Sequence, residues 1–68
     1  MNEKQIRGLI EPRNFIAAWF AELPKHDTYE KAYEAVEIIF EDYFGKRKYS
    51  GYESFKQVRM KIYKSNKK

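Results

Sequence analysis

The chain has 68 residues, enough for one domain with a small hydrophobic core. It has no cysteine and one histidine, which excludes disulfides, thiolate metal sites and histidine clusters, so we expect neither a metal nor a cofactor. The net charge is +4, and no run of about 18 apolar residues interrupts the polar sequence, so we expect a cytoplasmic protein without a membrane span. Five Phe, six Tyr and one Trp supply the apolar area that holds so short a chain together.

The charge is distributed unevenly along the chain. Residues 1–45 carry five Lys or Arg and nine Asp or Glu, whereas residues 46–68 carry nine Lys or Arg and a single acidic residue, Glu53. Such asymmetry favours an anionic partner. It is equally compatible with a basic helix that lies against the acidic helix of its own chain.

The N-terminal part predicts one short helix and one longer helix. Asn2 and Gln5 have the spacing of a capping box, and a short N-terminal helix would end before Pro12. Pro12 suits a first helical position, and the next helix is expected over about 13–23, ending where Leu23 precedes Pro24. Its broad apolar face consists of Phe15, Ile16, Trp19, Phe20 and Leu23.

The middle of the chain has the clearest helical period, over about 28–44. Asp27 and Glu30 predict its capping box, and Gly45 suits the left-handed residue that ends a helix. The apolar stripe comprises Tyr29, Ala32, Tyr33, Val36, Ile39, Phe40, Tyr43 and Phe44. The opposite side carries four glutamates, which we interpret as a solvated face: Glu30, Glu34, Glu37 and Glu41.

A last helix is expected over about 51–64, with Ser50 and Glu53 as its capping box. Its buried stripe would be Tyr52, Phe55, Val58 and Ile62, with Arg59 at the edge, where it would pair with the acidic helix. Residues 65–68 are expected to form a disordered basic tail. The sequence therefore predicts an all-α protein: a single domain over 1–64, built as a compact bundle of three main helices and a short N-terminal one.

Catalysis is not expected. The chain lacks a cysteine nucleophile, a G-x-S-x-G elbow and a glycine-rich phosphate loop. Its one histidine, His26, lies in a connector, where we expect it to be exposed to solvent. We therefore expect a protein that is not an enzyme.

Nucleic-acid binding is the leading functional hypothesis. A basic loop leads into the last helix, whose outer face presents further lysines and a glutamine that could reach an adenine edge. Lysine outnumbers arginine here, which favours phosphate contact over base reading. The candidate contact residues are Lys46, Arg47, Lys48, Lys56, Gln57, Lys61 and Lys64. Tyr63, beside these lysines, would either stack on an unpaired base or cover the rim of the core.

The alternative is a protein–protein interaction module without a nucleic-acid role. Its basic helix would meet an acidic protein surface, or the chain would form a homodimer. Ile38 and Met60 project away from the apolar stripes of their helices. A dimer patch would form if either adjoined the alanines opposite the apolar face of the second helix, which are Ala17, Ala18 and Ala21.

Overall fold

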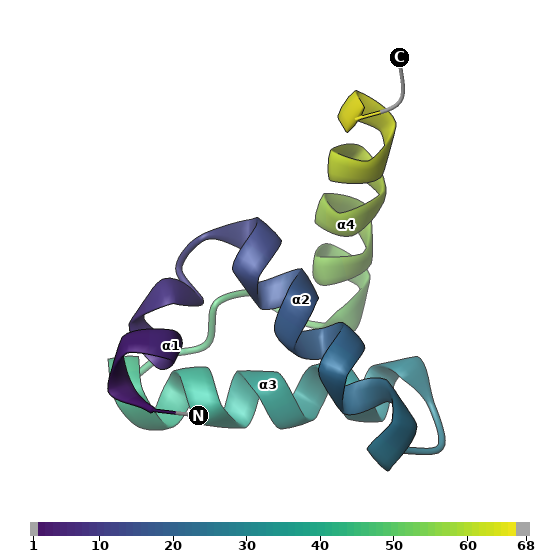
Figure 1. The fold of residues 1–68 in the computed structure, drawn as a ribbon. Coiled ribbons are helices and arrows are strands. Elements are labelled where there is room, and N and C mark those ends of the chain that lie inside the picture. Colours follow the sequence, from purple (N-terminus) through teal and green to yellow (C-terminus); the bar gives the residue numbers. More distant parts are fainter. Residues whose placement is uncertain (1, 67–68) are drawn as a thin grey trace.

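A computed structural model describes the backbone of residues 2–66 and the side chains of residues 2–64, and this part of the chain is helical throughout, without a strand (Figure 1). The elements are α1 (Glu3–Gly8), α2 (Pro12–Glu22), the short 3-10 helix η1 (Leu23–Lys25), α3 (Tyr29–Phe44) and α4 (Tyr52–Asn66). The prediction of a small all-α bundle is confirmed. Because α4 continues to Asn66, the expected tail is helical over its first two residues, and residues 67–68 lie outside the described part.

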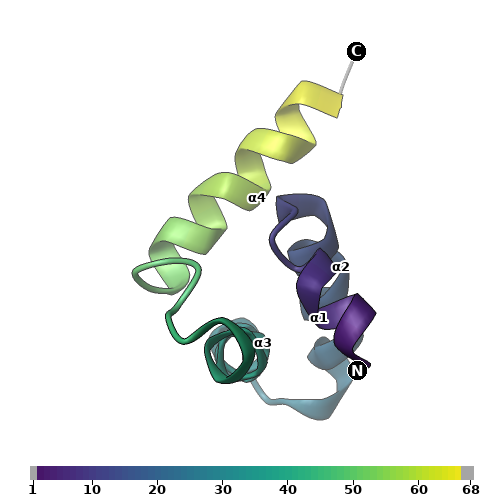
Figure 2. The same ribbon diagram turned by 90° about the vertical axis from the view of Figure 1, so that its left-hand side faces the viewer.

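Helix α2 crosses α3, and α1 lies beside the C-terminal part of α3, where the Tyr43 hydroxyl donates to Glu3 Oε2 at 3.0 Å. Helix α4 is steeply inclined to α3 (Figure 1). Its first turns pack against α2 and α3, and its C-terminal half projects beyond the rest of the bundle (Figures 1 and 2). One end of α4 is therefore held by the core, while the other end presents most of its circumference to solvent.

The core is centred on Phe15, which is fully buried. Its ring centroid lies 5.3 Å from that of Tyr49, 5.5 Å from Phe55, 6.1 Å from Tyr33 and 6.3 Å from Phe40. Burying a side chain of this size contributes about 1.5–3 kcal/mol. Rings from α2, α3, α4 and the loop before α4 thus meet at one point, which lets a short chain hold its helices together.

Pro12 occupies the first position of α2 as predicted. Of the three predicted capping boxes and the predicted helix-ending glycine, two signals are confirmed. The Asn2 side chain accepts from the Gln5 amide at 2.8 Å, and the Gln5 side chain accepts from the Asn2 amide at 3.0 Å, as in a capping box. Gly45 has a φ of 82°, and its N–H donates to the Glu41 carbonyl at 2.8 Å. A left-handed conformation of this kind favours glycine and ends α3.

The other two signals are wrong by one residue. The cap of α3 is Thr28, whose Oγ1 accepts from the Lys31 amide at 3.1 Å, because the chain is still extended at Thr28. Asp27 therefore lies outside the helix, and its carboxylate is 3.8 Å from Lys31 Nζ. Helix α4 begins at Tyr52, and Ser50 Oγ lies 2.7 Å from Ser54 Oγ, so the predicted Ser50 capping box does not start this helix.

Three aromatic residues assigned to apolar stripes are largely exposed. Phe20 is 49% exposed, Tyr29 58% and Tyr43 39%. Helical periodicity places a residue on a face, but it does not say where the covering helix ends.

Candidate nucleic-acid interface

A buried carboxylate organises the basic loop between α3 and α4. Glu37 of α3 is 0% exposed and accepts hydrogen bonds from the Tyr33 hydroxyl and from the amides of Lys48 and Tyr49, both at 2.9 Å. The interpretation of Glu37 as part of a solvated face is wrong. Residues four positions apart are separated by only about 40° around the helix axis, so Glu37 lies next to the buried Tyr33 on the helix surface. This spacing is the sequence signal that could have predicted the burial of Glu37.

The guanidinium of Arg47 is held by the fold. Its two terminal nitrogens donate to both carboxylate oxygens of Glu34 at 3.0 and 3.1 Å, and one of them also lies 3.4 Å from the Tyr33 hydroxyl. These hydrogen bonds, Glu34's first, raise the pKa of Arg47. A bidentate pair of this kind neutralises the arginine and fixes the loop to α3.

Lys48 is also engaged within the chain. Its ammonium donates to the Ile10 carbonyl at 2.6 Å and lies 5.4 Å from the ring centroid of Tyr49 and 5.7 Å from that of Phe40. Burial lowers the pKa of Lys48, against the attraction of Glu37. Lys46 is exposed at the same end of α3. Of the three cations in the loop, Lys46 is exposed, whereas Arg47 and Lys48 bind groups of their own chain.

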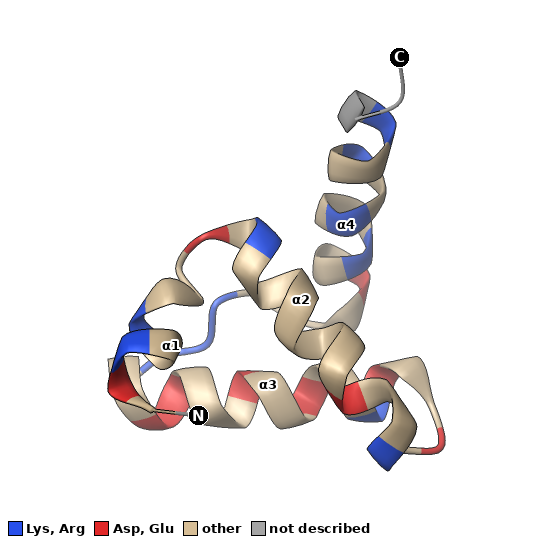
Figure 3. Cartoon of the chain, in the orientation of Figure 1, with Lys and Arg blue, Asp and Glu red and all other residues tan. Residues whose placement is uncertain are grey.

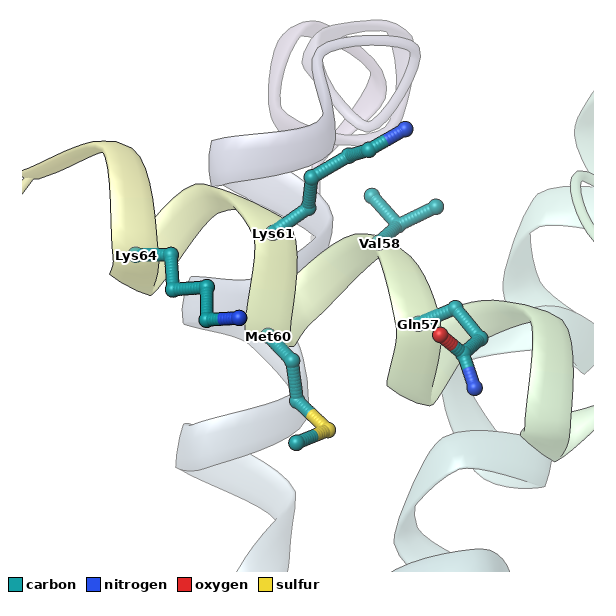
Figure 4. Close-up of a pocket in the computed structure, with 5 residues that line it drawn as sticks. All are labelled: Gln57, Val58, Met60, Lys61 and Lys64. Atoms are coloured by element: carbon teal, nitrogen blue, oxygen red, sulfur yellow. The ribbon is translucent and has the colours of Figure 1, made fainter.

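Three of the four residues predicted on α4 are exposed to solvent. Gln57, Lys61 and Lys64 line one hollow on the outer side of the helix together with Val58 and Met60 (Figure 4). Lys56 lies half-buried on an adjacent face. Within residues 2–64, no ion pair involves a lysine of α4.

The loop and α4 present their charges in different places. In Figure 3 the basic loop runs past α1, while the basic residues of α4 lie on the projecting helix, and acidic residues lie along α3 and also on other parts of the chain. Helix α4 itself contains one acidic residue, Glu53. The structure therefore brings Gln57, Lys61 and Lys64 together, with Lys56 nearby, and separates them from Lys46 to Lys48.

Arg59 lies at the edge of the core, as predicted, but its partner differs from the predicted one. Its guanidinium carbon is 4.6 Å from the ring centroid of Trp19, a cation–π contact, and not beside a glutamate of α3. Its Nε is buried without a hydrogen-bond partner in the described part of the chain. The Trp19 indole donates to the Tyr29 carbonyl at 3.0 Å, which fixes the ring beneath the guanidinium.

His26 is half-buried rather than exposed, because its Nε2 lies 3.0 Å from Glu22 Oε1. This hydrogen bond is the main cause that lowers the pKa of Glu22.

Among residues 2–66, no cluster of His, Asp and Glu is arranged to hold a metal ion. Over the same stretch, no helix combines the length and the apolar character needed to cross a membrane.

The fold and its surface define a small all-α domain with one projecting basic helix. No protein-family model matches the chain, and no curated protein and no solved structure matches it. Its function is therefore inferred from the chemistry of its own surface.

Proposed function

We propose that the protein is a non-enzymatic accessory protein that binds nucleic acid through the outer face of α4. The observation that carries this proposal is that Lys61 and Lys64 are exposed in one hollow of a projecting helix, with the half-buried Lys56 on an adjacent face, and that none of the three forms an ion pair with a described carboxylate. Arg47 and Lys48 leave the contact set because their charged groups already bind Glu34 and the Ile10 carbonyl. Lys46 stays as a peripheral contact.

Lysine is suited to phosphate contact, because its ammonium is a compact charge on a flexible stem. Each phosphate contact releases counterions and contributes about 0.9 to the slope of log affinity against log salt on duplex DNA. Three contacts therefore predict a slope of about −2.7, or an affinity about 40-fold lower at 200 mM than at 50 mM salt. Gln57 lines the same hollow as Lys61 and Lys64, and a glutamine amide can pair with the edge of an adenine.

The test is fluorescence anisotropy of labelled DNA and RNA at these two salt concentrations. The K56A/K61A/K64A variant should bind more weakly and with a shallower salt slope, while its circular dichroism stays helical. The matched control is K4A/K25A/K31A, which removes the same charge from other helices. Of its three lysines, Lys25 and Lys31 make only exposed ion pairs, with Glu22 and Asp27, of little energetic value. No binding at 50 mM salt, or equal losses in both variants, would refute the proposal.

A second candidate function is contact with an acidic protein surface. Met60 is 51% exposed and lies in the same hollow as Lys61 and Lys64, so this part of α4 has an apolar centre and a basic rim. Protein interfaces commonly have this arrangement. The homodimer form of this candidate predicts a mass that rises with protein concentration in light scattering. A constant monomer mass would exclude it.

A further inference from the structure

Two exposed aromatic rings lie side by side between α2 and α4. Phe20 is 49% exposed and Tyr63 is 42% exposed, and their ring centroids are 6.4 Å apart with an angle of 36° between the planes. Neither ring completes the core, which is filled by buried rings elsewhere. The two rings are tilted relative to each other, and both keep surface on which a flat ligand could stack.

An apolar hollow of about 190 Å³ adjoins these rings. It lies between α2 and the C-terminal half of α4, whose axes are inclined to each other (Figure 1). Its lining is mostly apolar and comprises Arg13, Ile16, Ala17, Phe20, Ile62 and Tyr63. Ala17 is exposed, and its small side chain keeps this side of the hollow open.

Cations border the rings on α4. Lys56, Arg59 and Tyr63 follow one another at helical spacings of three and four residues, so they form a stripe along the helix. The guanidinium of Arg59 covers Trp19, whose ring centroid is 5.0 Å from that of Phe20. Aromatic faces and positive charges therefore alternate across the junction of the two helices.

A nucleobase fits this chemistry better than a protein surface does. Stable protein interfaces cover about 800 Å² on each partner. A whole aromatic side chain covers about 150–250 Å², so two half-exposed rings offer only roughly 200 Å². That area suits one or two bases, and the nearby lysines suit the phosphates that connect them.

We infer that the nucleic acid bound by α4 is single-stranded, and that an unpaired base stacks on Phe20 and Tyr63. This inference rests on the proposed function and specifies its ligand. In a duplex the base faces are already stacked, so only an unpaired strand can use the rings. The strand would cross from the lysines on the outer face of α4, past Lys56, to the aromatic pair at the junction with α2.

The probes are a labelled 15-nucleotide oligothymidylate and a labelled 15-base-pair duplex, measured by anisotropy at low salt. Removing a stacking ring costs roughly 5- to 150-fold in affinity. F20L and Y63L should therefore weaken binding of the single strand by this factor and leave duplex binding unchanged. Y43L is the matched control, because Tyr43 is a similarly exposed ring that lies near the C-terminal end of α3, away from the aromatic pair. Trp19 is the chain's one tryptophan and contacts both Phe20 and Arg59, so its fluorescence should change on titration with oligothymidylate.

Equal affinity for the two probes, together with F20L and Y63L that bind like the wild type, would overturn the inference. Lysine-dependent binding would survive that result, so the proposed function would stand. Absence of binding to both probes would instead remove the inference and the proposed function together. Circular dichroism and thermal melting verify that F20L and Y63L are folded, and the conservative Y63F should retain single-strand binding because it keeps the ring.

Discussion

Replacing Glu37 with glutamine tests the carboxylate that joins α3 to the basic loop. One oxygen of Glu37 accepts from the Lys48 amide, and the other accepts from the Tyr49 amide and the Tyr33 hydroxyl. Glutamine preserves the shape but replaces one oxygen with an NH₂ group. In either orientation the new donor faces at least one backbone N–H, so that N–H loses its acceptor.

The expected loss of stability follows from these contacts. A hydrogen bond to a charged group contributes about 1.5–3 kcal/mol, and a buried donor left without an acceptor costs about 1–3 kcal/mol. These two figures describe overlapping parts of one change, so we expect a loss of about 2–4 kcal/mol. A domain of this length has a total stability of about 3–10 kcal/mol. The corresponding fall in Tm is about 8–30 °C, since each kcal/mol shifts Tm by about 4–8 °C.

The assay is thermal and urea unfolding followed by far-UV circular dichroism at neutral pH. The matched control is E41Q, one turn further along α3, because Glu41 is exposed and its substitution should change stability by less than about 0.5 kcal/mol. If E37Q unfolds within about 0.5 kcal/mol of E41Q, the carboxylate does not hold the loop, and the reasoning from burial and hydrogen bonding fails.

Two further predictions concern the same junction. Burial and the hydrogen bond to Glu37 raise the pKa of Tyr33, so the folded protein retains a proton that the unfolded chain loses above about pH 10, and stability should fall as pH rises past that value. In urea unfolding between about pH 8 and pH 11, Y33F should make the fall of stability with pH shallower. The fall should not disappear, because burial also raises the pKa of Tyr49. If stability falls equally steeply with pH in Y33F and the wild type, the assignment to Tyr33 is wrong. G45A should cost about 1–2 kcal/mol, because its φ of 82° strains an alanine although no atom lies within 4 Å of the added Cβ. G51A meets no atom within 4 Å either and has no positive φ, so a loss as large as that of G45A would mean that backbone conformation is not the cause.

The helices and two of their boundaries were predictable because the signals are local. The Asn2 capping box and the glycine that ends α3 depend on residues within four positions of each other. The burial of Glu37 was not predictable in this way, because its two backbone donors lie eleven and twelve residues further along the chain. The exposure of Phe20 also depends on distant residues, because the side chain nearest to its free side, Tyr63, is 43 positions further along the chain.

In the candidate site, too, features set by local sequence were predictable, and features set by distant contacts were not. Lys61 and Lys64 are exposed on the outer side of α4, where the helical period places them, whereas Lys56 is half-buried on an adjacent face. Arg47 and Lys48 have the same residue types, yet a loop has no period that says which way its side chains point. Their partners, Glu34 and the Ile10 carbonyl, become near neighbours only through the packing of α1 and α3.

The acidic helix therefore neutralises the loop rather than α4. Glu34 binds the Arg47 side chain and Glu37 binds the backbone of Lys48, which leaves these two carboxylates engaged at the start of the basic segment. Among the described residues, no glutamate of α3 forms an ion pair with a lysine of α4, so the proposed attraction of a polyanion rests on the charge of this one helix.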